Sequence, residues 1–127
     1  MKNKYLNLIE QSFEFPNEEF SLNDNELYWY NVPLMEIIKQ YGTPLRISFL
    51  PKIRMNIQRV RRMFNVAMAK VDYKGTYTYC YCTKSSHFSF IMEEILKNEV
   101  HLETSSAFDI NIIDSLYEAG QLKKDHF

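Results

Sequence analysis

From residue 45 onward the chain alternates between short apolar runs and longer segments of helical periodicity, and this alternation limits its possible folds most strongly. The longest helical segment carries one apolar stripe, whose members are Ile53, Ile57, Val60, Phe64, Met68 and Val71. Strand-like runs flank that segment at 45–50 and 76–82. A strand, a helix and a second strand in this order favour a parallel sheet with right-handed crossovers. We therefore predict an α/β protein.

One more strand and two more helices follow the run at 76–82. The strand is predicted over 100–103, and a helix with an apolar stripe lies on each side of it. The residues expected to cap or end these two helices are Ser86, Asn98, Glu99, Ser105 or Ser106, and Gly120. The predicted order from residue 45 is therefore βαβαβα.

Ahead of this region the sequence is polar and acidic around isolated aromatic residues, and we expect residues 1–25 to form an arm that packs on another part of the protein. A short strand is predicted over 26–30. Asn31 is the expected N-cap of a helix over 32–40, which Gly42 ends.

The overall charge excludes a bulk electrostatic attraction to nucleic acid or to an anionic membrane. The chain has 127 residues, the length of one domain, and its formal net charge is −1. Its local basic cluster consists of Lys52, Arg54, Arg59, Arg61 and Arg62. We interpret this cluster as a solvated helix face in preference to a polyanion site. No apolar stretch approaches the roughly 20 residues that a membrane span needs, so we expect a cytoplasmic protein.

The two cysteines lie in one predicted strand and are not expected to form a disulfide. Cys80 and Cys82 are two residues apart, which places both side chains on one face with backbone directions that disfavour a bond between them. His87 lies nearby, but a fourth ligand and the usual zinc-knuckle spacing are missing. We therefore predict small buried thiols in a reducing compartment and no metal site.

Lys84 is the residue that the pattern marks most clearly for chemistry. It follows the strand-like run at 76–82, and a polar turn separates it from the next helix. In parallel α/β proteins the active site lies where strands end and helices begin. A partly desolvated lysine amine in that position is the usual nucleophile for a Schiff base with an aldehyde or ketone. The alternative is a solvated lysine that closes a strand.

Three segments in order resemble the start of a known enzyme family. They are Tyr41-Gly42-Thr43-Pro44-Leu45, Tyr81-Cys82-Thr83-Lys84-Ser85-Ser86-His87 and His101-Leu102-Glu103-Thr104-Ser105-Ser106. From about residue 28 onward the chain is similar to the pyridoxal-phosphate-dependent decarboxylases that act on ornithine, diaminopimelate or arginine. The Lys84-Ser85-Ser86-His87 segment is most similar to that of biosynthetic arginine decarboxylases.

This resemblance implies a (β/α)8 barrel of the alanine-racemase type, joined to a β-domain. Residues 1–44 would be an arm and a short helix, and 45–127 the incomplete start of the barrel. Within that part, 45–50 would be a strand of the β-domain and 76–127 the first barrel units. A complete barrel takes about 250 residues, so we expect the chain to be an N-terminal fragment that is inactive alone.

The resemblance also implies a function and a set of site residues. Lys84 would form the Schiff base with pyridoxal phosphate in a homodimeric enzyme that converts arginine to agmatine and CO2. Diaminopimelate or ornithine as the substrate, or a non-catalytic barrel protein that binds the cofactor, remain alternatives. Glu103 would orient the Lys84 amine, or else accept helix-cap hydrogen bonds. From its position, Cys82 lies two residues before Lys84 and faces the same way, so it is the candidate neighbour of the cofactor. His87 begins the helix after Lys84 and would line the cofactor mouth or cap the turn.

Overall fold

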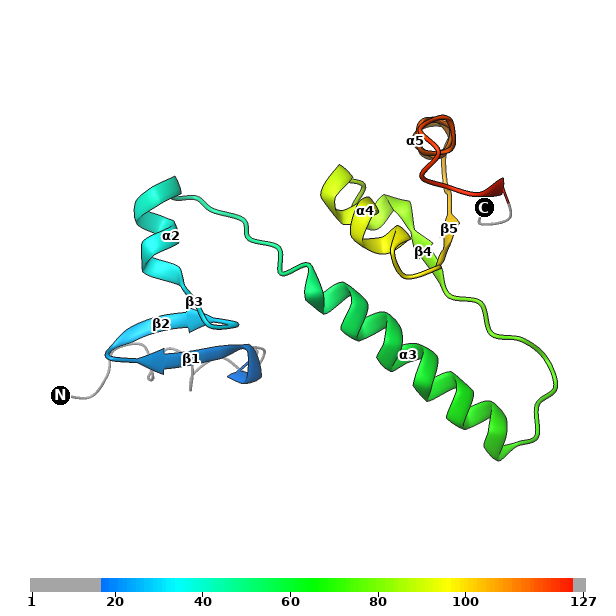
Figure 1. Ribbon diagram of the computed structural model, residues 1–127, viewed down its shortest axis with the longest axis horizontal. Helices are drawn as coiled ribbons and strands as arrows, with labels where there is room; N and C mark the ends of the chain where they lie inside the picture. Colours follow the sequence, from blue (N-terminus) through cyan, green and yellow to red (C-terminus); the bar gives the residue numbers. More distant parts are fainter. Residues whose placement is uncertain (1–16, 125–127) are drawn as a thin grey trace. The chain divides into compact units, whose positions relative to one another are not determined.

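In a computed structural model that describes residues 17–124, the chain is a small α/β protein with four α-helices in that range (Figure 1). The described strands form a three-stranded antiparallel sheet and a two-stranded parallel sheet, and neither sheet closes into a barrel. The chain divides into two compact units, Met1–Ile47 and Ser48–Phe127. The α/β class predicted from the sequence is confirmed.

The first unit contains a three-stranded meander. After the 3-10 helix η1 (Asn17–Glu19), strand β1 (Phe20–Asn23) pairs with β2 (Glu26–Trp29), and β2 pairs with β3 (Val32–Pro33). Each hairpin turn has two residues with positive φ, which suits the right-handed twist of the strands. Helix α2 (Leu34–Tyr41) follows and ends at Gly42. Gly42 has a φ of 80°, a conformation that glycine adopts without strain.

Two predictions for this unit need correction. The expected arm over 1–25 contains strand β1, whereas residues 1–16 lie outside the described range. Asn31 is not a helix cap, because it occupies the second hairpin turn with a φ of 66° and the helix begins after Pro33. The predicted strand over 26–30 is confirmed as β2.

The predicted strand over 45–50 is wrong. This segment has no strand partner among residues 17–124, and an apolar run forms a strand only where a neighbouring strand can pair with its backbone. Leu45 and Ile47 instead line a cavity of about 260 Å³ together with Phe20, Trp29 and Leu34.

The first helix of the second unit is the long helix α3 (Pro51–Lys70). It confirms the helix predicted from the apolar stripe. Pro51 occupies the first turn, where its missing N–H costs no hydrogen bond. The helix ends in a Schellman motif, in which Asp72 has a φ of 54° and the Tyr73 amide donates to the Met68 carbonyl at 2.9 Å. Of its predicted stripe, Ile57 is buried, whereas Phe64 is 48% exposed.

A parallel β-α-β unit follows α3. Strand β4 (Cys80–Cys82) leads through the 3-10 helix η2 (Thr83–Ser85) and helix α4 (Ser89–Leu96) into strand β5 (His101–Glu103). The two strands pair in parallel, as predicted. Strand β4 is shorter than the predicted 76–82, because β5 offers only three residues for pairing.

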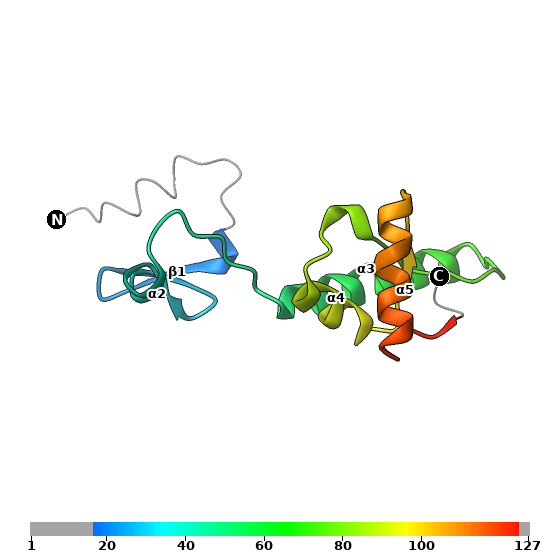
Figure 2. The same ribbon diagram turned by 90° about the horizontal axis from the view of Figure 1, so that it is seen from above.

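Helix α5 (Ala107–Glu118) completes the unit. Ser106 caps it as predicted, because its hydroxyl accepts a hydrogen bond from the Asp109 amide at 3.3 Å. Gly120 closes it with a φ of 69°. The prediction that Ser86 caps α4 is wrong, because η2 intervenes and the N-cap position is Phe88. Figure 1 looks down the axis of α5 and Figure 2 shows its length, so α5 crosses the direction of α3.

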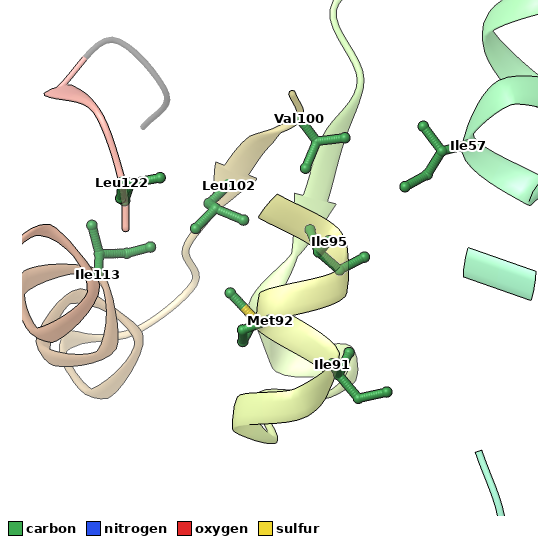
Figure 3. Packing of buried hydrophobic residues seen from close by; sticks show 8 residues of the cluster. All are labelled: Ile57, Ile91, Met92, Ile95, Val100, Leu102, Ile113 and Leu122. Carbon is green, nitrogen blue, oxygen red and sulfur yellow. The ribbon is translucent and has the colours of Figure 1, made fainter. Parts of the chain in front are cut away.

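The buried core of the second unit is built around α4 and β5 (Figure 3). Met92 of α4 points toward Leu102 of β5 and Ile113 of α5, and Ile57 of α3 approaches from the other side. The remaining members are Ile91, Ile95, Val100 and Leu122. Full burial of such a side chain contributes about 1.5–3 kcal/mol, so this cluster is the main source of stability for the parallel unit.

We expect Ile95→Ala to lower the free energy of unfolding by about 2–5 kcal/mol, because it leaves a cavity beside a side chain that is 2% exposed. Ile110→Ala makes the same change on α5 at a side chain that is 54% exposed, and it should change stability by no more than about 0.5 kcal/mol. Urea unfolding followed by circular dichroism measures both variants. Equal losses would contradict the assignment of the core.

Candidate functional site

The carboxyl ends of β4 and β5 lie side by side and bring the predicted site residues to one edge of the parallel sheet. Cys82 is the register partner of Glu103, so both strands end at the same level. Lys84 follows β4 by two residues, within η2. The Thr83 hydroxyl donates a hydrogen bond to the backbone oxygen of Glu103 at 3.1 Å and joins the two strand ends directly.

Lys84 is exposed, and its ammonium group has no hydrogen-bond or ion-pair partner among residues 17–124. Its position is set by its neighbour Thr83, whose side chain is fully buried. The arrangement therefore anchors the backbone at residue 83 and leaves the next side chain accessible to a ligand.

Glu103 ends β5 with an exposed side chain. Its carboxylate accepts a hydrogen bond from the Ser105 hydroxyl at 3.4 Å. Within the described part of the chain it forms no ion pair with Lys84. Glu103 was expected either to orient the Lys84 amine or to accept hydrogen bonds near the start of the next helix. The contact with Ser105, just before α5, corresponds to the second role.

Cys82 and His87 are close to Lys84 in sequence, two residues before it and three residues after it, but their side chains have different surroundings. Cys82 is half-buried with a free thiol, and Cys80 is free and exposed, so the prediction of a buried thiol is wrong for Cys80. His87 is exposed in the turn before α4. Its ring stacks on Phe88 with centroids 6.4 Å apart and meets the edge of Phe108 at 5.8 Å. His87 therefore links this turn to the first turn of α5.

Two residues central to this edge were missed in the sequence, namely Thr83 and Asp109. Asp109 is a carboxylate only 4% exposed, and it accepts hydrogen bonds from the Ser105 amide at 2.9 Å and the Ser106 hydroxyl at 3.0 Å. The Ser105 amide, helped by the Ser106 hydroxyl, holds the pKa of Asp109 below its usual value against the opposing effect of burial. The available signal was the spacing of Ser106 and Asp109, which matches a capping box.

Tyr81 supports the same edge from inside the unit. Its hydroxyl donates to the Ser86 backbone oxygen at 2.9 Å and holds the turn after η2. Burial raises the pKa of Tyr81, and the neighbouring Cys82 and Tyr79 add to the effect. Tyr81 therefore stays protonated and keeps donating this hydrogen bond at neutral pH.

Cys82, Lys84 and Glu103 therefore place a thiol, an amine and a carboxylate at or just beyond the same ends of the two paired strands. Within residues 17–124, no group of three or more His, Cys, Asp or Glu side chains is placed to hold a metal ion. None of the helices between residues 17 and 124 combines the length and the apolar composition that a membrane span requires.

Comparisons with protein-family models, with curated proteins and with solved structures find no match to this chain.

We expect Asp109→Asn to destabilise the protein at pH 7, because a carboxylate with a lowered folded-state pKa stabilises the fold above its unfolded-state pKa near 3.8. This contribution disappears as the pH falls through the lower, folded-state pKa. The difference in unfolding free energy between the variant and the natural chain should therefore shrink below about pH 4. Urea unfolding at pH 7 and at pH 3 measures it.

Asp114→Asn is the matched control, because Asp114 is exposed on the same helix. It should leave stability nearly unchanged at both pH values. A loss in Asp109→Asn that stays the same at low pH would show that the carboxylate charge does not stabilise the fold.

Proposed function

We propose that this chain supplies the cofactor lysine of a pyridoxal-phosphate-dependent amino-acid decarboxylase. The observation that carries the proposal is the position of Lys84, exposed two residues after a parallel strand whose neighbour ends in Glu103. In parallel α/β proteins, ligands bind at the carboxyl ends of the strands.

The chemistry required of Lys84 is modest. Its amine would hold the cofactor by a covalent bond to the aldehyde carbon, with the aldehyde oxygen leaving as water. When bound, pyridoxal phosphate accepts the electron pair that the departing CO2 leaves on the substrate. The accessible side chain of Lys84 and its anchored backbone suit the first of these steps.

Glu103 is the proposed partner of the Lys84 amine after a substrate amine displaces it. The strand ends are joined by the hydrogen bond from Thr83 to the Glu103 backbone, which supports a short separation between the two residues. In this role the Glu103 carboxylate would bind the Lys84 amine in place of the Ser105 hydroxyl that it binds in this structure.

The finer identity rests on the sequence resemblance described above. It favours arginine as the substrate, agmatine as the product, a (β/α)8 barrel that starts with β4 and β5, and a cytoplasmic homodimer. Diaminopimelate and ornithine are the alternative substrates. The three glycines lie at 42, 75 and 120, so the chain does not itself provide a glycine-rich cradle for the cofactor phosphate. We therefore propose that the isolated chain forms no agmatine.

We expect borohydride reduction in the presence of pyridoxal phosphate to label the chain at Lys84. Borohydride adds hydride to the carbon–nitrogen double bond and leaves a stable secondary amine, which peptide mapping by mass spectrometry locates. Lys84→Arg should remove the label, because a guanidinium does not form this bond. Lys97→Arg is the matched control at another exposed lysine and should keep it.

Equal labelling of several lysines, with no excess at Lys84, would contradict the proposal. Agmatine formation by the isolated chain would overturn the further claim that it is inactive alone.

A further inference from the structure

Helix α3 has a charge distribution unlike that of the rest of the chain. It carries six of the 15 basic residues and none of the 16 acidic residues. Its core-facing side includes Ile53 and Ile57. Any carboxylate that binds these basic residues therefore comes from outside this helix.

One side of α3, which we call the outer face, combines basic and apolar residues along a shallow groove of about 340 Å³. The residues that line it are Arg59, Arg62, Met63, Val66, Ala67 and Lys70. They recur at the three- and four-residue steps of one helix side, roughly opposite Ile57. All of them are exposed, including Met63 at 60% and Val66 at 48%.

Arg59 and Arg62 are exposed, which agrees with the solvated face predicted for the basic cluster, but the outer face also includes apolar side chains. A helix face that only meets water carries polar and charged residues, whereas here Met63 and Val66 lie between Arg62 and Lys70. Neither Arg59 nor Arg62 has an ion-pair partner among residues 17–124. The outer face thus offers both unpaired positive charge and uncovered apolar surface.

We propose that the outer face of α3 binds an acidic amphipathic helix of a partner protein. Arginine and methionine are enriched in protein interfaces, where arginine binds carboxylates in a bidentate fashion and methionine adapts to the opposing surface. Side chains spaced three or four residues apart form ridges along a helix, and the groove between two ridges accepts a ridge of a second helix. The absence of any carboxylate on α3 means that the partner supplies the negative charge.

The two other polyanion classes fit less well. A helix that lies in a lipid surface uses Trp, Phe or Leu as anchors, and the outer face has none of these. Single-stranded nucleic acid is bound by basic residues together with aromatic side chains on which bases stack, and the outer face carries no aromatic residue.

A synthetic helical peptide of about 20 residues, which matches the length of α3, is a suitable probe. It carries a leucine stripe flanked by glutamates, and a control peptide of the same composition distributes the leucines over all sides. Fluorescence anisotropy with the full chain should show binding of the first peptide and roughly tenfold weaker binding of the control.

Two charge reversals on the same helix separate the outer face from α3 as a whole. Arg62→Glu should weaken binding of the acidic peptide roughly tenfold or more, because it replaces an attraction with a repulsion. Arg54→Glu makes the same change in charge away from the outer face and should leave the affinity nearly unchanged. Both side chains are exposed, and circular dichroism checks that the variants fold.

Four results would overturn the proposal. They are equal binding of the two peptides, equal losses in the two variants, binding of anionic vesicles or single-stranded RNA without binding of the acidic peptide, and self-association of the chain that Arg62→Glu abolishes. The last result would identify the occupant as a second copy of this chain.

Discussion

The parallel pairing of β4 with β5 is the interaction on which the second unit depends. Two strands of three residues form few hydrogen bonds, so the pairing relies on apolar burial beside it. Val100 is fully buried next to β5, and Leu102 within β5 points to the same cluster as Met92 of α4 (Figure 3). The helix that connects the strands therefore also covers them, as expected for a β-α-β unit.

The same pairing explains why polar groups can be buried at the strand ends, next to an apolar core. The strands end together, and at that level the buried groups change from apolar side chains to Thr83 and Asp109. Each of these polar groups has hydrogen-bond partners, which removes most of the cost of burying it. Lys84 and Glu103 extend outward from this satisfied layer, so a rigid base carries the accessible groups.

The features predicted correctly from the sequence are those that depend on residues close together along the chain. The periodicity of α3, the parallel order of the strands and the Ser106 cap are of this kind. The segment 45–50 was mistaken for a strand, because an apolar run does not reveal whether another strand is available for pairing. Ser86 failed as a cap because the chain forms one 3-10 turn before the helix. Thr83 was missed because its hydroxyl binds the Glu103 backbone, 20 residues along the chain, whereas Asp109 was missed although its partners Ser105 and Ser106 lie within four residues of it.

The most direct test of the account is the register of the parallel strands, measured by nuclear Overhauser effects in an isotope-labelled sample of the chain. We expect backbone contacts between Tyr81 and Leu102 and between Cys82 and Glu103, in the same order along both strands. Such contacts would place the ends of β4 and β5, and with them Lys84 and Glu103, at one edge. Contacts in the opposite order, or no contacts between these strands, would contradict the fold and the candidate site built on it.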